Sequence, residues 1–153
     1  MQRHFVRKIK LNGNNFDYWD RLAHFELYSL ERRRERYMII YTWKIIESMV
    51  PNISDIESRK ILAYQTKRLG RKCYVPSVVG QSVLYKHFLA VIGPKLFNVM
   101  PRSIRDLTGC TVDVFKNNLD KFLSSISDQP IIAGYTGGNN QLYGSNSLID
   151  ILS

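Results

Sequence analysis

The stretch 29–46 (SLERRRERYMIIYTWKII) changes from almost all charged to almost all apolar along what reads as one helix. Surface helices usually separate polar from apolar residues by face and not by end. We expect a helix over 30–49, capped by Ser29 and terminated by Pro51 and Asn52. Its first half must then face water or an anion, and its second half must lie inside a core. The helix therefore belongs in the middle of the fold.

Positive charge is concentrated in the first half of the chain. Residues 1–72 contain 16 Lys and Arg against 8 Asp and Glu, a net charge of +8, whereas residues 73–153 contain 6 against 5. Charge of one sign on one region attracts polyanions. Three clusters are the candidate nucleic-acid contacts, namely Arg3, Arg7, Lys8 and Lys10; Arg32, Arg33, Arg34 and Arg36; and Lys67, Arg68, Arg71 and Lys72. We expect them to form one contiguous face; a merely solvated basic surface is the alternative.

Aromatic residues are interleaved with the second cluster, and they allow two interpretations. Tyr28 and Tyr37 flank the arginines, so phosphate contacts and stacking on bases can be combined there. The apolar surroundings of most aromatic residues are nevertheless more typical of a core. Those that we expect to be buried are Tyr37, Tyr41, Trp43, Phe115 and Phe122.

Apolar spacing and capping residues predict further helices. One covers residues 2–11, one covers 16–25 with Asn14 or Asn15 as its cap, and one covers 112–126 with Thr111 as its cap. Residues 83–92 are ambiguous between strand and helix, and Gly93-Pro94 is expected to stop them. The other short elements expected are a helix over 94–99, a helical turn between Pro101 and Thr108, and a docked apolar turn over 148–152.

The fold class expected is α+β, predominantly α-helical with a small antiparallel β-hairpin. Residues 61–64 and 73–75 are rich in β-branched and aromatic side chains, and they flank the basic, Gly-containing turn 66–72. Residues 1–130 are predicted to form a single helical domain. Residues 131–153 are predicted to be a flexible tail rich in Gly, Asn and Ser, with a short apolar end.

Several classes of protein are disfavoured by the sequence. It holds no paired catalytic aspartates, no GxSxG and no HExxH, so we expect a non-catalytic chain without a cofactor or small-molecule substrate. Cys73 and Cys110 stand apart from each other and from paired histidines, so we expect neither a metal site nor a disulfide. No apolar run reaches about 18 residues, and the N-terminus lacks a signal peptide's apolar region. We expect an intracellular chain, nuclear or cytoplasmic, without a membrane partner.

Five blocks of the sequence, in order, resemble the region that follows the reverse-transcriptase domain in polyproteins of non-LTR (LINE-type, jockey-like) retrotransposons. The resemblance extends over about residues 2–126. The blocks are residues 2–9 (QRHFVRKI), residues 18–34 (YWDRL, then LYSLERRR), residues 40–46 (IYTWKII), residues 93–101 (GPKLFNVMP) and residues 112–120 (VDVFKNNLD).

The resemblance implies a segment that follows the polymerase thumb and helps to hold RNA or DNA. The family's metal-binding aspartates lie in an upstream palm domain, which this chain does not contain, so we expect a truncated or separately predicted piece of such an element. The expected partners are RNA, DNA or both, and the upstream reverse-transcriptase domain where it is present. The alternative is a packing domain that supports the thumb without contacting nucleic acid.

Overall fold

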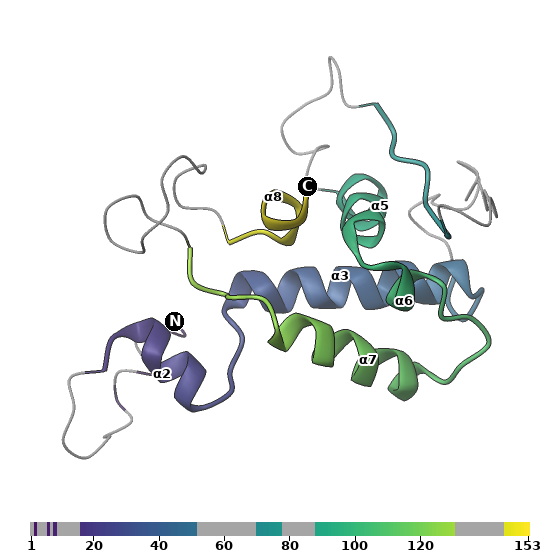
Figure 1. Ribbon diagram of the computed structural model, residues 1–153. Coiled ribbons are helices and arrows are strands. Elements are labelled where there is room, and N and C mark those ends of the chain that lie inside the picture. The colour runs from purple at the N-terminus through teal and green to yellow at the C-terminus, as the bar shows by residue number, and fades with distance from the viewer. Residues whose placement is uncertain are drawn as a thin grey trace.

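The computed structural model describes residues 2, 6, 8, 16–51, 70–77, 88–130 and 146–153. Of these residues 61% are helical and none lies in a β-strand. The helices are α2 (Tyr18–His24), α3 (Leu30–Ile46), α5 (Leu89–Val99), α6 (Arg102–Arg105), α7 (Val112–Ser124) and α8 (Leu148–Leu152) (Figure 1). Gln2, Val6 and Lys8, the described part of the helix expected over 2–11, are helical as well.

Helix α3 is the central element, as expected, with α7 on one side and α5 with α8 on the other (Figure 1). Its start is the predicted one, because the Ser29 hydroxyl accepts a hydrogen bond from Arg32 N at 3.1 Å. It ends at Ile46, three residues before the predicted end at 49. There Ser48 adopts the left-handed conformation (φ 55°), which ends the helix before Pro51 is reached.

The core forms where α3 meets α5 and α7, and its stacked aromatic pair lies between α3 and α7. Trp43 and Phe115 are both fully buried, and their rings stack with centroids 4.2 Å apart and an interplanar angle of 8°. The indole nitrogen of Trp43 donates to the Leu107 carbonyl at 2.9 Å, so this buried donor is satisfied. Leu119 and Leu123 extend the same apolar stripe along α7. The prediction of a buried Trp43 and Phe115 is thus confirmed.

Helix α5 corrects the expectation that Gly93-Pro94 stops the chain's regular structure. A single helix runs from Leu89 to Val99 through both residues. Gly93 is needed because a Cβ at this position would overlap the hydroxyl of Thr42, so its absence lets α5 approach α3 closely. Pro94 is buried in the same packing, which outweighs the loss of one helical hydrogen bond.

The predicted β-hairpin is wrong, and the α+β class with it. Residues 70–77, which include the second predicted strand, have no strand partner among the described residues. The side chain of Asn98 takes that place: its Oδ1 accepts from Cys73 N at 2.7 Å, and its Nδ2 donates to Cys73 O at 2.8 Å. The backbone of this segment is therefore satisfied by a helix. The first predicted strand, 61–64, lies outside the described residues.

Two smaller expectations are also resolved. Helix α2 is capped by Asp17, not by Asn14 or Asn15, and the Asp17 N–H donates to the Asp20 carboxylate at 3.3 Å. The docked turn expected over 148–152 is confirmed as α8, whose Leu148 is fully buried. The described end of the predicted tail is therefore part of the core.

Candidate nucleic-acid interface

Arg32, a candidate phosphate contact, is turned into the protein. Its side chain is only 1% exposed, and Nη2 donates to the carbonyls of Ser127 and Asn146 at 3.0 and 3.2 Å. Its Nε lies 3.6 Å from Asp128 Oδ1. Every one of these contacts is internal, so Arg32 holds the fold together and does not face a ligand.

Glu35, one turn further along α3 than Arg32, binds the same end of the chain through its carboxylate. Its carboxylate accepts from the Ser147 hydroxyl at 2.6 Å and from Leu148 N at 3.0 and 3.1 Å, so it receives the start of α8. Burial raises the pKa of Glu35, although these hydrogen bonds and nearby Arg32 oppose the shift. Arg32 and Glu35 together fasten the end of the chain to α3.

Arg36 is likewise paired inside the molecule. Its Nε and Nη2 donate to the two carboxylate oxygens of Asp120 on α7, at 2.5 and 2.7 Å. A bidentate pair of this kind fixes the guanidinium in one orientation. The guanidinium carbon lies 5.6 Å from the ring centroid of Tyr37. Arg36 therefore joins α3 to α7 and also supports the Tyr37 ring.

The two described residues of the third cluster differ, because Arg71 is bound inside the protein and Lys72 is not buried. Arg71 donates through Nη2 to Glu47 at 2.6 Å and through Nη1 to the Leu107 carbonyl at 3.1 Å. Its own carbonyl accepts from Arg105 Nη1 at 2.5 Å. Lys72 is exposed. Arg71 thus serves the fold at the C-terminal end of α3, far from Arg33 and Arg34 at the other end.

Glu47 is the acid that receives Arg71. Burial opposes its ionisation, but hydrogen bonds from Gly109 N, Arg71 and the Thr108 hydroxyl outweigh burial and hold the pKa below its ordinary value. The ionised carboxylate is therefore the form that the folded chain favours.

The remaining predicted contacts fall into two groups. Lys8 is exposed. Five others lie outside the described residues: Arg3, Arg7, Lys10, Lys67 and Arg68. The expectation that all three clusters form one contiguous cationic face is not met by Arg32, Arg36 and Arg71, because their guanidinium groups are directed at the protein's own acceptors.

Arg33 and Arg34 have a different environment, on a side of α3 whose residues are exposed or half-buried. Successive residues of a helix are rotated by about 100°, so residues 30, 33, 34, 37, 41 and 44 share one face. We call this the outer face of α3; its members are Leu30, Arg33, Arg34, Tyr37, Tyr41 and Lys44. Of the two acids within α3, Glu35 lies on another side of the helix, and Glu31, three residues before Arg34, borders the outer face. The outer face therefore carries three cations and no acid of α3.

The exposure of Tyr37 was missed by the sequence analysis. Its side chain is 64% exposed, and Tyr41 is only half-buried, so the prediction of a core role is wrong for Tyr37. A shallow hollow of about 510 Å³ lies beside it, lined by apolar residues and by Lys44 and Lys116. Lys116 comes from α7 and makes one 3.4 Å contact with Asp113. The spacing of Arg33, Tyr37 and Lys44 by four and seven residues is the sequence signal for this face.

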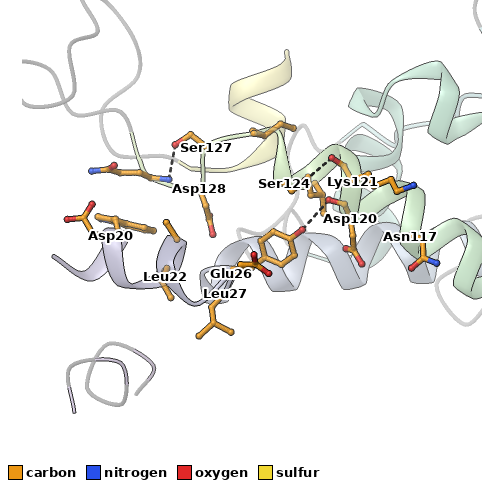
Figure 2. Close-up of a pocket in the computed structure, with 16 residues that line it drawn as sticks. Asp20, Leu22, Glu26, Leu27, Asn117, Asp120, Lys121, Ser124, Ser127 and Asp128 are labelled. Atoms are coloured by element: carbon orange, nitrogen blue, oxygen red, sulfur yellow. Dashed lines mark hydrogen bonds between the residues drawn. The ribbon is translucent and has the colours of Figure 1, made fainter. Parts of the chain in front are cut away.

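A second, larger hollow of about 950 Å³ lies between α2 and the C-terminal half of α7. Figure 2 shows Asp20 on α2, Asp120 on α7 and Asp128 beyond it, with Glu26 following α2. Lys121 is the only cation among its lining residues. Asp120 and Asp128 are paired with Arg36 and Arg32, so Asp20 and Glu26 are the acids of this hollow that face no arginine in these pairs. This hollow is therefore less suited to a phosphate than the hollow beside Tyr37.

The environment of Cys73 and the placement of possible metal ligands can be read from the described residues. Burial raises the pKa of the Cys73 thiol to about 12, so this cysteine is a packed side chain and not a nucleophile. In the described part of the chain no three His, Cys, Asp or Glu side chains are placed to hold a metal ion. None of its helices is long and apolar enough to cross a membrane.

No protein-family model, curated protein or solved structure matches this chain.

Proposed function

We propose that this chain is a non-catalytic nucleic-acid-binding domain, and that the outer face of α3 contacts the phosphate backbone. The observation that carries the proposal is the contrast between neighbouring arginines. Arg32 and Arg36 are bound to internal acceptors, whereas Arg33, Arg34 and Lys44 lie on the outer face and form no ion pair with the described residues. Arg34 is exposed, and Arg33 and Lys44 are half-buried. Cations without an internal partner are the ones that can replace counterions on a polyanion. Lys116 adds a further cation at the rim.

The context that we propose is an accessory segment of a retrotransposon reverse transcriptase. Support comes from the five sequence blocks that resemble the region after the polymerase domain of non-LTR elements. In that setting the domain holds RNA or DNA, while a separate palm domain carries out the chemistry.

The test is the salt dependence of binding to an RNA or DNA oligonucleotide of about 16 nucleotides, followed by fluorescence anisotropy. Each phosphate contact on a single strand contributes about 0.7 to the slope of log K against log salt. The double substitution Arg33→Gln and Arg34→Gln is expected to make that slope shallower by about 1.4.

The matched control removes two charges elsewhere, at Lys95 on α5 and Lys121 on α7. The Lys95→Gln, Lys121→Gln variant has the same net charge as the test variant and is expected to keep the wild-type slope. Equal slopes for both double variants, or no binding by the wild type at low salt, contradict the proposal.

A packing domain is the second candidate, favoured by the large apolar side chains that the surface exposes. Leu30 is 50% exposed and Phe88 is 60% exposed. A neighbouring polymerase domain that covers them would raise the melting temperature of the mixture, and the Arg33 and Arg34 substitutions would leave this increase unchanged. The internal pairing of Arg32, Arg36 and Arg71 leaves those three arginines without a role in such docking.

A further inference from the structure

Tyr37 is a large aromatic side chain that the fold supports from one side and leaves open on the other. Arg36 lies 5.6 Å from the centroid of its ring and is itself fixed by the two hydrogen bonds to Asp120. A guanidinium over an aromatic ring is attracted to it and holds it in place. Because 64% of Tyr37 remains exposed, the ring is both supported and accessible.

We propose that Tyr37 is a stacking platform for an unpaired base, and that the ligand of this domain is therefore single-stranded nucleic acid. The inference rests on the proposed function and specifies its substrate class. A base inside a duplex has both faces covered by its neighbours, so only an unstacked base can lie on a protein ring. Stacking on an aromatic side chain tolerates any base, because every base has a π-face.

The cations are placed along the helix so that phosphates on both sides of such a base can be bound. Arg33 precedes Tyr37 by four residues and Lys44 follows it by seven, which corresponds to about 6 Å and about 10 Å along the helix axis. An extended strand laid along the outer face thus meets a cation before the ring and another after it. A single-strand groove is built in this way, from cations that track the backbone and rings that receive bases.

The hollow beside Tyr37 gives a neighbouring base a place to lie. Its walls are largely apolar and include Met38, Ile40, Tyr41 and Leu89. At about 510 Å³ it is large enough for one planar ring system, and Lys44 and Lys116 at its edge are suited to the attached phosphates.

The experiment compares three probes of about 16 residues that differ only in their bases or strand number: oligothymidine, the same chain with abasic sites, and a duplex. The wild type is expected to bind oligothymidine roughly 5- to 150-fold more tightly than the abasic chain. Stacking a single base on an aromatic side chain changes the affinity by about this factor. Tyr37→Leu is expected to bind both single strands equally, with an unchanged salt slope. Tyr37→Phe keeps the ring and is expected to keep the preference.

The outcomes separate the two proposals. Failure of the wild type to bind any probe overturns the proposed function and the inference with it. Binding that ignores the bases, favours the duplex or is unaffected by Tyr37→Leu overturns the inference alone and leaves phosphate binding in place. Because Tyr37 is exposed, equal melting temperatures of the variants show that the change is one of binding.

Discussion

The two sides of α3 carry the same residue types and use them in opposite ways. On the inner side, Arg32 and Arg36 are bound to Asp128 and Asp120, and the groups that receive them come from the far end of the chain. On the outer side, Arg33, Arg34 and Lys44 meet no acid of α3. Residues 32 and 33 are adjacent in the sequence, yet a rotation of about 100° gives one a structural role and the other a surface role.

This difference shows why the number of arginines in a segment is a poor measure of its affinity for nucleic acid. A guanidinium held by a bidentate carboxylate has two of its five N–H donors occupied, and its charge is largely neutralised locally. An arginine without such a partner keeps its charge available for long-range attraction to a polyanion. The interpretation of a charge cluster therefore requires knowing where its acids lie in space.

The largest expected effect comes from the inner side. Arg32→Met leaves the Ser127 and Asn146 carbonyls and the Asp128 carboxylate without their buried cation, and loss of one partner of a buried pair typically costs about 3 kcal/mol or more. Chemical unfolding followed by circular dichroism is expected to show this loss. Arg33→Met is the matched control, because a surface substitution changes stability by about 0.5 kcal/mol or less. Equal losses for the two variants remove the distinction between the two sides.

A smaller effect, dependent on pH, is expected from two acids at opposite ends of the inner side. The Glu47 carboxylate accepts from Arg71, Thr108 and Gly109, and Glu47→Gln is expected to cost about 2 kcal/mol at neutral pH. Because folding lowers the pKa of Glu47, the stability it contributes is present above its ordinary value of 4.5 and is lost as the pH falls through the folded-state value. The loss of unfolding free energy that Glu47→Gln causes should therefore be smaller at acidic pH.

Glu35 is expected to show the opposite sign, which makes it the control for Glu47. Folding raises its pKa, so its contribution is present at acidic pH and is lost as the pH rises above 4.5 through the folded-state value. The free energy of unfolding of Glu35→Gln, measured relative to that of the wild type, should increase as the pH rises. An increase of this relative free energy at acidic pH, or the same pH dependence for Glu35→Gln and Glu47→Gln, contradicts the opposite signs assigned to the two acids.

The smallest expected effect is on the outer side. The double substitution Arg33→Gln and Arg34→Gln is expected to change the free energy of unfolding by about 0.5 kcal/mol or less, since the described residues show no internal bond to either guanidinium. Differential scanning calorimetry at high salt checks this result. A marked fall in melting temperature would show that these arginines also hold the fold and would weaken the comparison.

The parts of the fold that local chemistry determines could be predicted from the sequence. Ser29 and Thr111 cap α3 and α7 as expected, because a hydroxyl one position before an apolar-periodic segment satisfies backbone N–H groups in the first turn. The apolar end of the chain forms the short helix α8 for a similarly local reason, its own hydrophobic spacing. These features need no knowledge of distant residues.

The parts that depend on distant partners could not be predicted. The helix continues through Gly93 and Pro94 because both are buried in tertiary packing, where Gly93 lies closely against Thr42 of another helix. The strand expected near Cys73 is replaced because Asn98 satisfies its backbone. For the site, the partner of Arg36 stands 84 residues away in the sequence, and nothing local indicates which arginine it will bind.

The junction between Asp128 and Asn146 has a practical consequence. Asn146 Nδ2 donates to the backbone and carboxylate oxygens of Asp128 at 3.2 and 3.1 Å, so two chain positions 18 apart are joined directly. The entropy of closing the chain between joined points grows by only about 0.6 kcal/mol for each doubling of its length. Doubling the number of residues between these two joined positions is therefore expected to cost only about 0.6 kcal/mol in closure entropy, which makes this interval the first choice for inserting a reporter module.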